Sequence, residues 1–92
     1  QNGSLKIGPL LIQWGHVTSK QTAKRVAQKF NFPIAFSDTP AVFTQCVDST
    51  TYPDLFNVNA YNITNTEFTM GFMCNYSTLN NLKAVWIAIG KA

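Results

Sequence analysis

The closing segment of the chain, Trp86-Ile87-Ala88-Ile89-Gly90, has apolar residues on both faces of a would-be strand. A matching run, Leu10-Leu11-Ile12-Gln13-Trp14-Gly15, lies near the start. Side chains of a β-strand alternate between two faces, so a half-exposed strand should alternate apolar with polar residues. These two segments have no water-facing side, and a chain of 92 residues is too short to surround them with its own layers. We therefore expect other copies of the same chain to cover them.

The composition indicates one small all-β domain. Charged residues make up 12% of the chain, which is about half the usual share. Polarity comes instead from Asn, Thr and Ser. Asn favours turns and Thr favours strands, and both are poor residues for the interior of a helix.

Turn signals at regular spacing divide the sequence into about six short strands, the pattern of a small antiparallel β-sandwich. Alternating apolar residues assign Phe56, Val58 and Ala60 to the inner face of one strand. They assign Phe68, Met70 and Phe72 to the inner face of the next. The expected strands cover residues 10–15, 25–32, 41–48 and 56–63, a segment around 68–72, and residues 83–90.

The segment from 19 to 32 is ambiguous. Ala23, Val26, Ala27 and Phe30 fit helical spacing, whereas Val26, Phe30 and Phe32 fit strand alternation. A helix that starts near residue 19 would have to stop before Pro33. We assign residues 25–32 to a strand because of the family resemblance described below.

Three longer connections should meet at one end of the sandwich, because successive connections between antiparallel strands alternate between its ends. They cover residues 16–24, 49–55 and 75–81. Loops held by a rigid sheet often carry recognition residues, and tyrosine rings with amides and carboxylates suit hydroxyl-rich ligands. The alternative is that these residues only form turns. The candidate ligand-binding residues are His16, Tyr52, Asp54, Asn75, Tyr76, Asn80 and Asn81.

The remaining polar groups give little support to catalysis or metal binding. His16 is the only histidine, and its sequence neighbours suggest no acid–base partner. Of the four carboxylates, only Asp54, with Asp48 at a strand end, should approach the loops, so a glycosidase pair is not expected. Cys46 and Cys74 match no metal-site spacing and are read as reduced core residues. We therefore expect no enzyme activity, no cofactor and no metal.

The net charge of +3 is unevenly placed, with Lys20, Lys24, Arg25 and Lys29 in one short stretch. The simplest interpretation is a solvated loop and strand face, and the alternative is contact with an anionic cell surface. Nucleic-acid binding would need a larger basic surface, so it is not expected. No apolar run approaches the length of a membrane span, so no membrane insertion is expected either.

Four segments together resemble the C-terminal domain of bacteriophage tail fibres. They are Leu11-Ile12-Gln13-Trp14-Gly15, Phe32-Pro33-Ile34-Ala35-Phe36, Thr66-Glu67-Phe68 and Trp86-Ile87-Ala88-Ile89-Gly90. The resemblance covers nearly the whole chain, but the family usually has a Thr-Val-Thr-like strand where this chain has residues 25–31. Because the shared residues look structural, the resemblance transfers a fold and a role without a set of binding residues.

The resemblance implies an H-type-lectin-like β-sandwich, assembled as a homotrimer at the tip of a fibre. It implies attachment of the virion to a bacterial surface glycan, such as lipopolysaccharide or capsule, or to an outer-membrane protein. Residues 1–7 would be a linker or the end of a fibre shaft, and residues 8–92 the receptor-binding domain; the fibre would assemble in the host cytoplasm. The alternatives are a structural trimerisation cap and a free-standing lectin. Trp14 and Trp86 are expected to pack in the core or between subunits.

Overall fold

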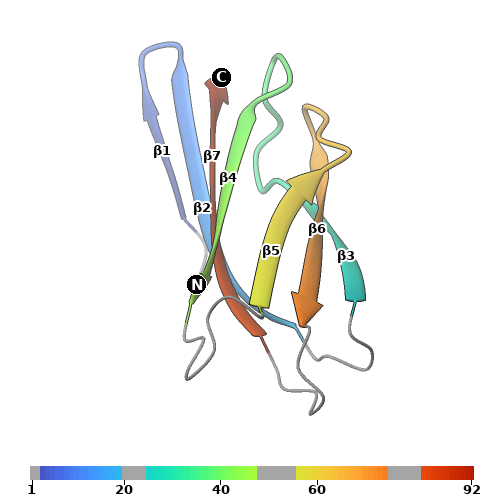
Figure 1. Cartoon of the computed structure of the whole chain (residues 1–92). Helices are drawn as coiled ribbons and strands as arrows, with labels where there is room; N and C mark the ends of the chain where they lie inside the picture. The colour runs from blue at the N-terminus through green and yellow to red at the C-terminus, as the bar shows by residue number, and fades with distance from the viewer. Residues whose placement is uncertain (1–2, 20–24, 48–55, 75–81) are drawn as a thin grey trace.

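The computed structural model is a sandwich of two antiparallel sheets (Figure 1), and it describes residues 3–19, 25–47, 56–74 and 82–92. The four-stranded sheet has the order β1-β2-β7-β4 and the three-stranded sheet the order β3-β6-β5. The strands are β1 (Gly3–Ile7), β2 (Leu10–Ser19), β3 (Arg25–Asn31), β4 (Ala41–Val47), β5 (Phe56–Tyr61), β6 (Glu67–Cys74) and β7 (Leu82–Lys91).

The expected all-β sandwich is confirmed, with seven strands in place of about six. The ambiguous segment is strand β3, which pairs with β6 from Arg25↔Met73 to Asn31↔Glu67. A helix there would leave one long edge of β6 without a partner.

The additional strand, β1, lies in the segment that we expected to be a linker or the end of a shaft. It pairs with β2 from Gly3↔Trp14 to Ile7↔Leu10. Gly8 has a φ of +58°, and the next residue is Pro9, whose ring fixes a negative φ. A positive and then a negative φ match a two-residue type II′ turn, the kind that joins twisted antiparallel strands tightly.

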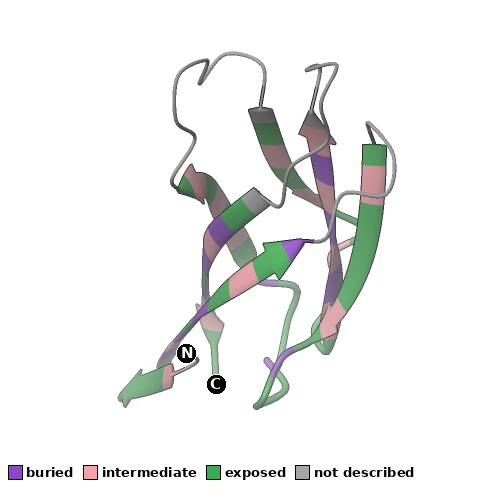
Figure 2. Ribbon diagram, turned by 90° about the horizontal axis from the view of Figure 1, so that it is seen from below, coloured by how far each residue is buried: buried purple, intermediate pink, exposed green. Residues whose placement is uncertain are grey.

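The core lies between the sheets and comes from one face of each inner strand. Phe68, Met70 and Phe72 of β6 are fully buried, as the alternation predicted. Ala84, Trp86 and Ala88 of β7 are also buried, and Val58 and Ala60 of β5 pack against the same cluster. Buried and exposed residues alternate along these strands (Figure 2). Trp86 is therefore a core residue, one of the two places expected for it.

An aromatic cluster closes one end of the core. The ring of Phe32 lies 5.0 Å from Phe36, 5.3 Å from Phe68 and 5.9 Å from Trp86, measured between ring centroids. Phe30 stacks on Phe68 at 5.5 Å. The connection from β3 to β4 thus contributes to the core, which accounts for the aromatic residues that flank Pro33 and Ile34.

A buried amide holds this connection against the four-stranded sheet. The Gln13 side chain of β2 is fully buried. Its Nε2 donates to the carbonyl oxygen of Ile34 at 2.7 Å, and its Oε1 accepts from the Ile34 N–H at 3.0 Å. One side chain therefore satisfies both backbone groups of Ile34, as buried polar groups require.

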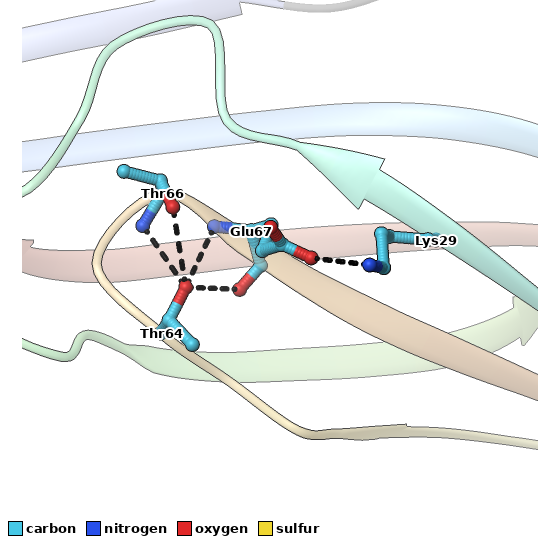
Figure 3. A network of polar contacts seen from close by, with 4 residues as sticks. All are labelled: Lys29, Thr64, Thr66 and Glu67. Carbon is cyan, nitrogen blue, oxygen red and sulfur yellow. Dashed lines mark hydrogen bonds and ion pairs between the residues drawn. The ribbon is translucent and has the colours of Figure 1, made fainter.

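The turn from β5 to β6 is organised by Thr64 (Figure 3). Its Oγ1 accepts hydrogen bonds from the N–H of Thr66 at 3.2 Å and from that of Glu67 at 3.1 Å. Asn65 then ties the turn to the aromatic end of the core, because its Nδ2 donates to the Phe36 carbonyl oxygen at 3.2 Å. Beside the turn, Lys29 Nζ lies 3.0 Å from Glu67 Oε2.

A Thr64→Val variant should lower the free energy of unfolding by about 1–2 kcal/mol, because two backbone N–H groups lose their acceptor. Thr64→Ser keeps the hydroxyl group and should cost much less. Urea unfolding of both variants at one protein concentration measures the difference. Equal losses in the two variants would show that the hydroxyl group does not hold the turn.

Candidate functional site

Six strand ends meet at one end of the sandwich. In the four-stranded sheet, the register places Ser19 opposite Leu82, and Val47 opposite Lys83. In the three-stranded sheet, Arg25 is opposite Met73, and Phe56 is opposite Cys74. Figure 1 shows the two sets of strand ends at the same end of the molecule. This is the end where the sequence placed the three longer connections, so the expected alternation of strand directions is confirmed.

Six of the seven candidate ligand-binding residues, Tyr52, Asp54, Asn75, Tyr76, Asn80 and Asn81, lie outside the described residues. The seventh, His16, was expected in a connection, and this placement is wrong. His16 is an exposed residue within β2, opposite Val85 of β7. Strand β2 continues to Ser19 because β7 begins at Leu82 and supplies partners that far.

The outer face of the four-stranded sheet carries exposed apolar residues on all four strands. The side chains of two residues directly opposite each other on neighbouring strands point to the same side of the sheet. The neighbouring pairs on this face include Leu5 with Ile12, Trp14 with Ile87, and Phe43 with Ile87. Single-chain exposure is large, for example 61% for Phe43 and 43% for Ile87. We call this surface the apolar sheet face; it consists of Leu5, Ile7, Leu10, Ile12, Trp14, Phe43, Val47, Val85, Ile87 and Ile89.

The outer face of the three-stranded sheet is different, because it is polar and carries a groove of about 400 Å³. Two cross-strand rows form most of it: Arg25, Met73 and Asn57 in the first, and Ala27, Gly71 and Asn59 in the second. Tyr61, which is exposed, also lines it. We call this surface the sheet groove.

The sheet groove was not predicted from the sequence. The alternation that places Val58 and Ala60 inside also places Asn57, Asn59 and Tyr61 outside, so one wall was readable from the sequence. The opposite wall is β3, and its place beside β6 rather than beside another strand follows only from the sheet order.

Cys46 is half-buried and packs against the core, as expected for it, and Cys74 has no described side chain. Within the ranges that the structure describes, no three histidine, cysteine or carboxylate side chains gather closely enough to hold a metal ion. No membrane-spanning helix is found in the described part of the chain.

Residues 6–91 match the protein family described as tail fiber protein gp53-like, C-terminal. The chain belongs to this family. The resemblance to phage tail fibre C-terminal domains is therefore confirmed, and the chain is part of a virion component. Among curated proteins, none is similar enough in sequence to be matched.

Solved structures of similar fold include an R1-type pyocin tail fiber, with a TM-score of 0.72 and 17% identity over 98% of this chain and 85% of that one. Discoidin II of Dictyostelium discoideum has a TM-score of 0.71 and 17% identity over 92% of this chain and 38% of its own. The tailspike gp49 of Pseudomonas phage LKA1 has a TM-score of 0.66 and 20% identity, over 88% of this chain and 15% of its own. At these identities the likeness establishes the fold alone.

Proposed function

We propose that this tail fibre domain forms the distal tip of the fibre as a homotrimer and attaches the virion to a bacterial surface receptor. The receptor class that fits best is a surface polysaccharide, such as lipopolysaccharide or capsule; an outer-membrane protein is the alternative. The role requires no chemistry from the domain, so we propose an adhesin rather than an enzyme. Assembly would take place in the host cytoplasm. The receptor-binding domain, residues 8–92, would be extended by β1 (Gly3–Ile7), which belongs to the four-stranded sheet.

The apolar sheet face supports the assembly. Soluble monomers rarely expose a contiguous apolar surface that crosses a whole sheet, and such a surface usually marks an interface between proteins. Burying it contributes about 25 cal/mol for each Å² of apolar area. A second copy of the same chain offers the same apolar side chains. In a closed ring of copies, the apolar sheet face of every subunit is covered by its neighbours.

One observation carries the attachment role: six strand ends meet at the end of the sandwich opposite the described C-terminus. A trimer built on the apolar sheet face leaves this end free in each subunit. Three weak sites on one fibre then gain through effective concentration, because binding of the first brings the others close to the cell surface.

The direct test is competition. The 92-residue chain, added to host cells before the parent phage, should block adsorption in a dose-dependent manner, and a fluorescently labelled chain should stain those cells. A structural trimerisation cap would assemble but would neither stain the cells nor block adsorption. That result would contradict the proposal in favour of the cap.

Tyr52→Ala and Tyr76→Ala are expected to weaken adsorption by about tenfold each, since an aromatic contact to a sugar is worth roughly 1–2 kcal/mol. The oligomer and the melting temperature should not change. Tyr52→Phe and Tyr76→Phe, which keep the ring at the same positions, serve as the controls for tyrosine replacement. Unaltered adsorption in both alanine variants would remove these connections from the site.

A further inference from the structure

The sheet groove owes its shape to one residue in the middle of the sheet. Gly71 lies in the central strand β6 and has no side chain, so side chains of the neighbouring strand β5 can lie over it. A Cβ at this position would lie 2.6 Å from Asn59 Oδ1 and 3.3 Å from Tyr61 Cε1. Glycine inside a strand weakens it, and it often marks a place where another group approaches the backbone closely. Here the amide of Asn59 and the ring of Tyr61 make that approach.

The groove is basic. Arg25 is its only charged lining residue among those the structure describes. Its guanidinium reaches the sulfur of Met73 at 3.7 Å, which is a weak contact that leaves most of its donors without a hydrogen-bond partner among the described residues. Glu67, the carboxylate on the outer side of β6, lies at the other end of the strand and pairs with Lys29 at 3.0 Å. A guanidinium in this position suits a carboxylate or phosphate from a ligand.

The other walls suit a sugar ring. Tyr61 offers an exposed aromatic ring, and Asn57 and Asn59 offer amide donors and acceptors for hydroxyl groups. The volume of about 400 Å³ lies within the range of about 300–1,000 Å³ found for small-molecule sites. Single-stranded nucleic acid would need a longer basic track with several stacking rings, which this groove lacks in the described residues.

We propose that the sheet groove binds an acidic saccharide, with the acid group on Arg25, the hydroxyl groups on Asn57 and Asn59, and the ring against Tyr61. The inference deepens the proposed function, on which its biological role rests, by naming the class of surface glycan. It also adds a binding surface on the strands of each subunit. The first row of this surface, Arg25, Met73 and Asn57, lies at the strand ends where the longer connections begin.

The test is an NMR titration of the ¹⁵N-labelled chain with uronic-acid oligosaccharides (galacturonate, glucuronate and mannuronate), their neutral counterparts and inorganic phosphate. At least one acidic oligosaccharide should shift the amides of Ala27, Asn59 and Gly71. Arg25→Gln should weaken that binding by about tenfold, the loss expected for one charge-assisted contact. Lys29→Gln is the matched control, because it removes a positive charge from the same strand and leaves the groove lining intact. Its affinity should stay within about twofold of the wild type.

Three results would overturn the inference. The first is the absence of shifts with every acidic oligosaccharide. The second is equal binding by the wild type and Arg25→Gln. The third is that inorganic phosphate shifts the same amides and binds as tightly as the acidic oligosaccharides. That result would indicate an anion site without sugar recognition.

Host-cell staining separates the two proposals. If the labelled Arg25→Gln chain still stains host cells, the domain attaches to the cells but the sheet groove takes no part in the attachment. If the wild-type chain binds a saccharide in the groove but does not stain host cells, the groove is a saccharide site and the proposed attachment role is contradicted.

Discussion

An Ile87→Asp variant should lose the trimer and sediment as a single folded chain. Ile87 lies at the centre of the apolar sheet face, with Trp14 of β2 on one side and Phe43 of β4 on the other. In a trimer built on this face, its side chain is taken out of water. An aspartate there would bury an unpaired carboxylate, which costs several kcal/mol in each subunit and exceeds what one lost isoleucine contact would remove. The interior of the sandwich is unaffected, because Ile87 points away from Trp86 and Ala88.

Ile34→Asp is the matched control. Ile34 is exposed to a similar degree, 47% against 43% for Ile87, but it lies outside the four-stranded sheet. This variant should remain a trimer under conditions where Ile87→Asp is monomeric. Sedimentation velocity measures the assembly, and circular dichroism confirms that each variant is folded. A trimer of Ile87→Asp as stable as the wild type would exclude the apolar sheet face as the interface.

Gln13→Leu should lower the free energy of unfolding by about 2–4 kcal/mol. Leucine has a similar volume, so packing changes little. The N–H and the carbonyl group of Ile34 both lose their partner in a partly buried site, and each such loss costs about 1–3 kcal/mol when the group is shielded from water.

Gln28→Leu makes the same chemical change at an exposed position of β3 and should alter stability by less than about 0.5 kcal/mol. Urea unfolding must compare the variants at one protein concentration, because assembly adds to apparent stability. If Gln13→Leu unfolds at the same urea concentration as the wild type, the connection from β3 to β4 does not depend on the amide.

Much of the fold could be predicted because the inner faces of β6 and β7 are apolar. Phe68, Met70 and Phe72 alternate so regularly that their burial follows from the sequence alone. The closing strand was also readable, since Trp86 and Ile87 carry apolar side chains on both faces. That same pattern led to the prediction of an interface.

Other features depend on pairing that one sequence does not display. Strand β1 alternates polar Ser4 and Lys6 with apolar Leu5 and Ile7, but this signal covers only four residues, and its ladder with β2 identifies it as a strand. The partner of Gln13 lies 21 residues further along the chain and meets it only once the sheets have packed. His16 was misplaced for a similar reason, although the β-branched residues Val17 and Thr18 after it were a signal that the strand continues.

The sheet groove could be predicted only in part. Asn59 and Tyr61 follow from alternation, whereas Arg25 reaches the groove through the order β3-β6-β5, which fixes which strands are neighbours. Gly71 gave no signal in the sequence, because a glycine within a strand has several explanations. Its role in the groove is seen only in the structure, where the side chains of Asn59 and Tyr61 lie close to it.

Light scattering of the purified 92-residue chain across a range of concentrations gives the decisive mass. If sister chains hide the apolar surface of the four-stranded sheet, the solution mass will be about three times 10.2 kDa, with no lighter species above the dissociation constant. A constant mass of 10.2 kDa at every concentration would mean that this surface stays in water, and the proposed fibre tip would have no basis.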